Sequence, residues 1–184
     1  MSTPWIAFQG TVKSNSPSAP VERHPAGSSG NLASVGRYVV YADRVKVGGS
    51  RAWRNTNPGN MNGSLKDNPT AIGRDSNGFL IFSDEVTGGK AMIALLKIPK
   101  FFNLSINDAM KKYAPPHEND TAGYIDILER VGELDASKKI SELTADEFNR
   151  LVKVIRQVEG WKVGSEYRLG DTNAPKGVKD LLGY

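Results

Sequence analysis

One carboxylate stands out because of its place on a predicted helix. Thr144-Ala-Asp-Glu147 is a capping box, which predicts a helix that runs to about Val158 and ends at Gly160. On a wheel of about 100° per residue, Glu159 falls inside the apolar stripe of this helix. The stripe consists of Phe148, Leu151, Val152, Ile155 and Val158. Burial and the helix dipole both disfavour a carboxylate at a helix C-terminus, and the resulting raised pKa suits a general acid at neutral pH. Glu159 is therefore the first candidate acid. The alternative is that the last turn frays and the carboxylate reaches water or an arginine.

A second acid lies in the polar segment 114–121, between a Pro-Pro break and a predicted helix start. Asn119, Asp120 or Thr121 is expected to cap that helix, so capping explains part of the cluster but not Glu118. Glu118 is therefore the second candidate acid. The alternative is an ordinary solvated loop residue.

Asparagines and arginines gather in the turn-rich segment 51–60, around a tryptophan. These residues are Arg51, Trp53, Arg54, Asn55, Asn57 and Asn60. Amide donors and acceptors, cations and a flat apolar face together suit a polyhydroxylated sugar that carries N-acetyl groups. The alternative is an asparagine-rich turn that satisfies its own backbone.

The elements that must position these residues indicate a helix-dominated α+β domain, residues 36–184, after an irregular N-terminal arm, residues 1–35. The arm is rich in Ser, Pro, Gly and Ala, which is typical of a flexible or loosely docked segment. The expected elements are a strand or hairpin over 38–47, a long loop over 51–69, a strand over 78–82, helices over 83–98, 105–113, 121–131 and 144–158, and a short helical piece near the C-terminus.

Composition excludes several classes of protein. The 184 residues contain no cysteine and only two histidines, so we expect no thiolate chemistry, no metal site and no cofactor. No apolar run approaches the roughly 18 residues that span a bilayer, and we expect no membrane insertion. The net charge of +4 comes mostly from the first fifty residues, with five Lys/Arg against two Asp/Glu. Without a basic stripe interleaved with aromatics, we expect no nucleic-acid partner.

Three motifs in order resemble a known family. They are Arg-Ala-Trp-Arg-Asn-Thr-Asn-Pro-Gly-Asn-Met at 51–61, Ala-Ile-Gly-Arg-Asp-Ser-Asn-Gly-Phe-Leu-Ile-Phe at 71–82, and Ala-Pro-Pro-His-Glu-Asn-Asp-Thr-Ala-Gly-Tyr at 114–124. They resemble the lysozyme-like domains of phage structural proteins and of type VI secretion effectors that cut peptidoglycan. Segment 73–82 is also similar to the β-hairpin of goose-type lysozymes and lytic transglycosylases, and segment 118–124 to a late Glu-Thr-x-x-Tyr motif of transglycosylases.

The resemblance implies a lysozyme-like fold that cleaves the β-1,4 bond between N-acetylmuramic acid and N-acetylglucosamine, either as a muramidase or as a lytic transglycosylase. It implies that the sugar groove is lined by Asn55, Asn57, Asn60, Phe79 and Tyr124. A second carboxylate such as Asp75 or Asp84 would assist hydrolysis. In the family the acid-bearing helix precedes the hairpin, but here no glutamate lies between Glu22 and Glu85. Segment 151–161 resembles that helix, as though the order of elements were permuted.

The resemblance also implies how the chain reaches its substrate. The N-terminal residues lack the features of a signal peptide, so we expect a chain that is made in the cytoplasm, moved by a secretion apparatus and active in the periplasm of a target cell. The expected partners are the glycan strand, a secretion component and a periplasmic immunity protein that occludes the active site near Glu159 and Asn57. The alternatives are a phage virion-associated lysin and a non-catalytic glycan-binding structural module.

Overall fold

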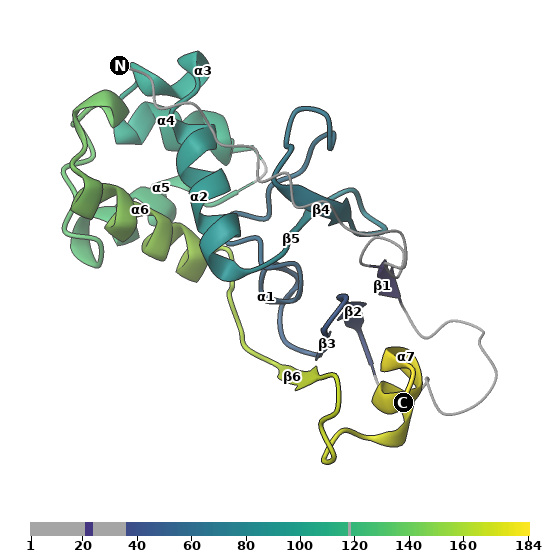
Figure 1. The fold of residues 1–184 in the computed structure, drawn as a ribbon. Coiled ribbons are helices and arrows are strands. Elements are labelled where there is room, and N and C mark those ends of the chain that lie inside the picture. The colour runs from purple at the N-terminus through teal and green to yellow at the C-terminus, as the bar shows by residue number, and fades with distance from the viewer. Residues whose placement is uncertain (1–20, 24–35, 118) are drawn as a thin grey trace.

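Two lobes make up the part of the chain that the computed structural model describes, residues 21–23, 36–117 and 119–184. Figure 1 shows a group of helices at one end and a small antiparallel sheet with the last helix at the other. The fold is α+β, as the order of elements predicted. None of the helices in this part of the chain is long and apolar enough to cross a membrane.

The sheet lobe contains four strands in the order β1-β2-β3-β6, all antiparallel. Their bounds are β1 Val21–Arg23, β2 Tyr38–Val40, β3 Arg44–Val47 and β6 Ser165–Arg168. Helix α7 (Lys176–Leu182) packs on one face, where Tyr38 and Val45 bury against Val178. The hairpin expected over 38–47 is thus confirmed. Part of the expected arm, residues 21–23, pairs with β2, while residues 1–20 and 24–35 lie outside the described residues.

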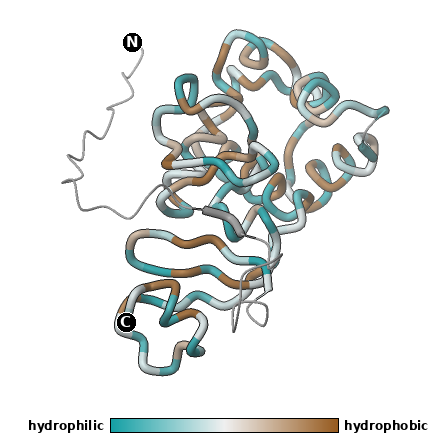
Figure 2. Tube along the Cα trace, turned by 90° about the vertical axis from the view of Figure 1, so that its right-hand side faces the viewer, coloured by the Kyte–Doolittle hydropathy of each residue, from teal (hydrophilic) through white to brown (hydrophobic). Residues whose placement is uncertain are grey.

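The helical lobe holds the main core. Its helices are α2 Glu85–Leu96, α3 Pro99–Phe102, α4 Ile106–Tyr113, α5 Thr121–Arg130 and α6 Ala145–Val158, with a 3-10 turn at Ile140–Glu142. Brown and teal alternate along these helices in Figure 2, as amphipathic helices require. Completely buried side chains from several helices meet in this core, among them Met92, Ile106, Leu128 and Ile155.

Helix boundaries follow the capping residues. Ser105, Asp120 and Thr144 accept hydrogen bonds from backbone N–H groups of α4, α5 and α6, as expected. Helix α2, expected to begin near residue 83, has Asp84 as its N-cap: the Asp84 carboxylate Oδ1 accepts from the Thr87 N–H at 2.7 Å. A carboxylate is a stronger acceptor than a hydroxyl and carries a charge that the helix dipole favours.

The segment between the lobes carries two of the three motifs singled out above, those at 51–61 and 71–82. The long loop expected over 51–69 in fact begins with a one-turn helix, α1 (Arg51–Arg54), capped by Ser50. Strands β4 (Ala71–Arg74) and β5 (Leu80–Phe82) then form a hairpin whose apolar side chains join the helical core. The connecting segment thus lies where side chains from both lobes can reach it.

Candidate functional site

Glu159 lies at the C-terminal end of α6, which is fixed at both ends. At its start, Thr144 Oγ1 accepts from the Glu147 N–H at 3.2 Å and the Glu147 carboxylate accepts from the Thr144 N–H at 2.8 Å. At its end, Glu159 is the C-cap residue and Gly160 turns the chain out of the helix with φ 71°. Glu159 is half-buried, in agreement with its place beside the apolar stripe of the helix.

Among the described residues, one side-chain donor holds the Glu159 carboxylate. Asn60 Nδ2 donates to Glu159 Oε2 at 3.0 Å, a contact between residues 99 positions apart. Burial raises the pKa of Glu159, the Asn60 hydrogen bond lowers it, and burial prevails, so the pKa is raised. The carboxyl therefore keeps its proton to a higher pH than an exposed glutamate, which is the property a general acid needs.

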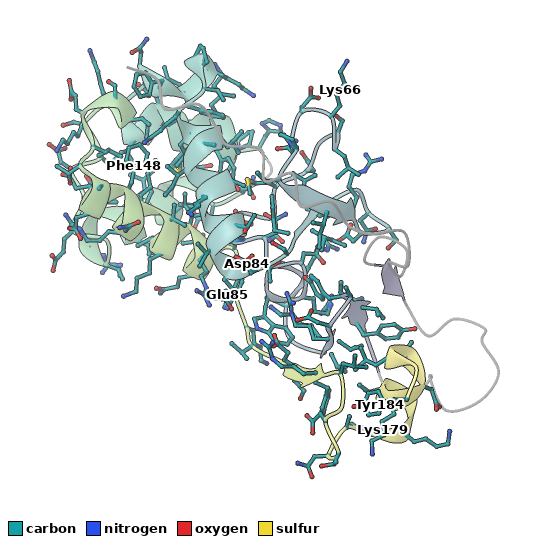
Figure 3. All side chains as sticks on the ribbon, viewed as in Figure 1. Lys66, Asp84, Glu85, Phe148, Lys179 and Tyr184 are labelled. Carbon is teal, nitrogen blue, oxygen red and sulfur yellow. The ribbon has the colours of Figure 1, made fainter. Side chains whose placement is uncertain are left out.

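The alternative in which the Glu159 carboxylate pairs with an arginine can be checked against Arg156, on the same helix. Arg156 Nη1 forms an ion pair with Glu85 Oε2 at 3.2 Å and its guanidinium stacks on Trp161 at 3.9 Å. Figure 3 shows Glu85 at the start of α2, beside the end of α6. Glu159 forms no ion pair within the part of the chain that the structure describes, so its carboxylate is held by the amide of Asn60.

Two tyrosines, the partly buried Tyr113 and the buried Tyr124, lie close enough to Glu159 for its charge to act on them. Burial raises the pKa of Tyr113, on α4, and the charge of Glu159 raises it further. Burial also raises the pKa of Tyr124, on α5, with smaller contributions from Tyr113 and Glu159. Both hydroxyls therefore stay protonated at any physiological pH. The Tyr113 hydroxyl donates to the Gly59 carbonyl, whereas the Tyr124 hydroxyl and Asn60 Oδ1 find no hydrogen-bond partner among the described residues.

These unsatisfied atoms are what a ligand would use. A buried polar atom without a partner costs about 1–3 kcal/mol, so it is expected to meet water or ligand. Three residues that were expected to line a sugar groove, Asn55, Asn60 and Tyr124, have such a buried atom, and of these Asn60 contacts Glu159. Tyr113 escaped the sequence analysis. Its spacing of three, four and seven residues from Met110, Ala109 and Ile106 places it on the apolar face of α4, and that signal was available.

Asn55 and Asn57 do not line an open surface, because both are completely buried. Asn57 Nδ2 donates to the carbonyls of Met61 and Leu80, and Asn57 Oδ1 accepts from the Met61 N–H. Asn55 Nδ2 donates to Asp75 Oδ2 at 2.9 Å. The structure therefore gives these two asparagines a bracing role, tying segment 55–61 to the β4–β5 hairpin. This was the alternative interpretation of the motif.

Asp75 organises the hairpin turn. Its Oδ1 accepts from the N–H groups of Asn77 and Phe79, both at 2.9 Å, and its Oδ2 accepts from Asn55 and lies 3.5 Å from Arg51 Nε. The side chain is completely enclosed. Both oxygens are occupied by structural contacts, and none of these contacts leads to Glu159 in the described part of the chain. The expected role as a second catalytic carboxylate has no geometric support.

Phe79 and Glu118 complete the set of predicted residues. Phe79 is half-buried, and the Arg51 guanidinium lies 4.3 Å from its ring centre. Together the ring and the cation form a surface beside the hairpin that is partly apolar and partly charged. Glu118 lies outside the described residues. Around it, Asp120 caps α5 and the Asn119 N–H donates to the Pro115 carbonyl, so part of the polar cluster is structural, as expected.

A cavity of about 390 Å³ lies on the outer side of the helical lobe. It is lined by Asn107, Lys111, Pro116, Thr121, Ala122, Ile125, Asp126 and Glu129. Among its α5 residues, Ala122, Asp126 and Glu129 lie on the face away from Tyr124, whereas Thr121 and Ile125 lie nearer to it. Neither Glu159 nor Asn60 lines this cavity, so it is a different place from the surroundings of Glu159. The candidate site is at Glu159, where a half-buried carboxyl with a raised pKa accepts a hydrogen bond from Asn60.

Comparison with known proteins finds no family model that matches the chain, and no curated protein matches it significantly. No group of three or more Asp, Glu or His side chains that could hold a metal ion occurs among the described residues. The site is thus characterised by its own geometry: a half-buried carboxyl, one amide donor and two protonated tyrosines.

Proposed function

We propose that this protein has a lysozyme-like fold and cleaves the β-1,4 bond between N-acetylmuramic acid and N-acetylglucosamine in peptidoglycan, with Glu159 as the general acid. The observation that carries the proposal is the carboxyl of Glu159, half-buried at the end of α6 and held by Asn60. Its raised pKa suits protonation of a glycosidic oxygen. Of the residues expected to line a sugar groove, Asn60 and Phe79 are partly exposed and are the proposed sugar contacts, whereas Tyr124 is buried in the core.

The permuted order of elements gains support from the contact between Asn60 and Glu159. In the family that the motifs resemble, the acid-bearing helix comes before the hairpin. Here α6 follows the hairpin in sequence. Its C-cap residue, Glu159, nevertheless contacts Asn60, which lies in the segment that leads into the hairpin. The backbone agrees, because the Ser50 N–H donates to the Lys162 carbonyl at 2.8 Å and fastens the end of α6 beside α1.

No second carboxylate contacts Glu159 among the described residues, and this favours lytic transglycosylation over hydrolysis. Asp75 is enclosed in the hairpin turn and Glu85 pairs with Arg156. Asp84 caps α2, and its pKa is lowered because hydrogen bonds from Ser83 and Thr87 outweigh its partial burial. Asp75 is enclosed, whereas Asp84 and Glu85 are exposed but engaged in the helix cap and the Arg156 ion pair, and no contact joins any of the three to Glu159 among the described residues. In the proposed reaction Glu159 gives its proton to the leaving oxygen as the C1–O4 bond breaks. The muramic C6 hydroxyl bonds to C1, and its proton returns to Glu159.

The setting that the resemblance implies is an antibacterial type VI secretion toxin. We propose that the chain acts in the periplasm of a target cell, after delivery by a secretion component, and that a periplasmic immunity protein blocks the surface around Glu159. A phage virion-associated lysin would use the same chemistry. A non-catalytic glycan-binding module would keep the surface without the acid, but the raised pKa of Glu159 favours an enzyme.

Mass spectrometry of products from purified sacculi tests the proposal. Anhydromuropeptides are expected. Reducing ends would indicate a muramidase, and co-sedimentation without release would indicate the binding module. Expression with and without an export signal, each with the neighbouring gene, tests the setting. Toxicity only after export, relieved only by an exported neighbour, is expected. Toxicity confined to the cytoplasm would exclude peptidoglycan as the target.

A further inference from the structure

The orientation of the Glu159 carboxyl depends on a residue in an uncommon backbone conformation. Asn60 has φ 45°, in the left-handed region, where asparagine is tolerated but not favoured. In this conformation the Asn60 amide lies 3.0 Å from Glu159 Oε2 and donates a hydrogen bond to it. A conformation that costs free energy persists when its surroundings fix it, so the contacts around Asn60 matter for the acid.

Those contacts come from two sides. On the loop itself, the Asn60 N–H donates to the Asn57 carbonyl at 3.1 Å, and Asn57 is completely buried. From α4, the Tyr113 hydroxyl donates to the carbonyl of Gly59, the residue that precedes Asn60. Gly59 leaves just enough room for this approach: a Cβ there would lie 2.7 Å from the Tyr113 hydroxyl and 2.6 Å from Met92 Sδ.

We propose that Tyr113 is a positioning residue for the acid: its hydroxyl clamps Gly59 and so holds Asn60 in the conformation that orients the Glu159 carboxyl. Its catalytic meaning rests on the proposed function, but the clamp is a property of the folded chain. Tyr113 touches the loop and not the reacting atoms, and it acts through Asn60.

The groups that face Glu159 allow this clamp to be measured. Tyr113 of α4 and Tyr124 of α5 are its titratable neighbours, and both hydroxyls stay protonated near neutral pH because they are buried. The nearby charges of Arg156 and Glu85 neutralise each other. The Asn60 hydrogen bond lowers the pKa of Glu159, so loss of the clamp must raise it.

Carbon-13 NMR titration of the glutamate carboxyl signals measures that pKa directly, and the signal that disappears in Glu159→Gln identifies the residue. Asn60→Ala is expected to raise the pKa by about one unit and Tyr113→Phe by about half a unit. Gly59→Ala, which pushes the hydroxyl away, is expected to act in the same direction as Tyr113→Phe. The matched control is Tyr184→Phe, which removes a hydroxyl-to-carbonyl bond of 2.8 Å in the sheet lobe and should leave the pKa unchanged.

A double-mutant cycle separates positioning from a general structural effect. If Tyr113 acts through Asn60, then Tyr113→Phe adds no further shift once Asn60 is alanine. An equal shift in both backgrounds, or no shift in either, would overturn the inference. Because the titration needs no substrate, a chain that shows the coupling but leaves sacculi intact would contradict the proposed function alone.

Discussion

Two carboxylates, Glu159 and Asp75, sit on either side of the same asparagine-rich segment and are treated in opposite ways. Asp75 is completely enclosed and receives hydrogen bonds from two backbone N–H groups and one amide, with Arg51 nearby. Glu159 is half-buried and receives one side-chain hydrogen bond, from Asn60. The asparagines differ accordingly, since Asn55 serves the hairpin turn and Asn60 serves the end of α6.

The difference shows that the number of donors decides what a carboxylate can do. A buried carboxylate with a complete set of donors is a stable anion and a structural element. A partly buried carboxylate with a single donor loses hydration that this donor does not replace. Its protonated form is therefore favoured, and it can take up and release a proton at higher pH. The following experiments test that contrast.

The largest effect is expected for Glu159→Gln. Loss of the only proposed acid should reduce muropeptide release at least about 100-fold. The thermal midpoint should stay the same or rise, because the amide removes a partly desolvated charge. Glu129→Gln, an exposed change on α5, is the matched control and should keep full activity. If Glu159→Gln keeps activity and Glu118→Gln loses it, the assignment of the acid is wrong.

Asp75→Ala is expected to act on stability. It leaves two N–H groups, the Asn55 amide and Arg51 without their acceptor, which should lower the free energy of unfolding by about 3 kcal/mol in urea titrations. Activity per folded molecule should remain within a few-fold. A stable Asp75→Ala protein that cannot cleave sacculi would give Asp75 the catalytic part that its contacts argue against.

The pH dependence of activity should follow Glu159. Its pKa is raised, and the acid must be protonated to react, so kcat should fall as pH rises through a value above that of an ordinary glutamate. The pH profile of product release measures this. The control is Glu129→Gln, which should keep the wild-type profile. If kcat already decreases near the usual glutamate pKa of about 4.3, the raised pKa of Glu159 is contradicted.

Glu159 and Glu147, at the two ends of α6, should change the stability of the fold with pH in opposite directions. The raised pKa of Glu159 means that its proton stabilises the fold at low pH, and this contribution is lost as pH rises through the folded-state pKa. The Glu147 pKa is lowered to about 2, chiefly by Lys138, so its contribution is present above the unfolded value and lost as pH falls toward 2. Thermal midpoints of Glu159→Gln and Glu147→Gln from pH 2 to 8 should therefore diverge in opposite directions from the wild type. Parallel curves would contradict both shifts.

The smallest effect is expected for Thr144→Ala. Removal of the hydroxyl that caps α6 should cost about 1 kcal/mol of unfolding free energy, because one N–H at the helix start loses its acceptor. Urea denaturation measures it, with the exposed Thr172→Ala as a control that should change little. A loss equal to that of Asp75→Ala would mean that the capping residue also supports the core.

Local patterns predicted much of this arrangement. The capping box at Thr144, the hairpin over 38–47 and the place of Glu159 beside an apolar stripe all depend on neighbours within one element, and the structure contains each of them. Strand β6 escaped prediction because its residues Ser165–Arg168 lack apolar alternation and become a strand only by pairing with β3. Non-local pairing of this kind leaves little trace in the sequence.

The three asparagines show the same difference between what local sequence predicts and what depends on the fold. In the sequence Asn55, Asn57 and Asn60 share one turn-rich motif and the same chemistry, so all three were expected to bind sugar. Which of them is enclosed depends on where the hairpin and α6 come to lie. The role of Asp75 was missed for the same reason, because its partners at 51 and 55 are brought near by the fold.

The distance of 99 positions between Asn60 and Glu159 has a consequence for how the protein is made. Contacts of such long sequence separation form late, since the intervening chain must be ordered first. A nascent chain still on the ribosome, or one threaded through a narrow conduit, carries every residue of the site but no oriented carboxyl. The proposed activity is therefore expected to begin only when this contact has formed, and a protease cut between the two residues that lets the pieces separate is expected to abolish it.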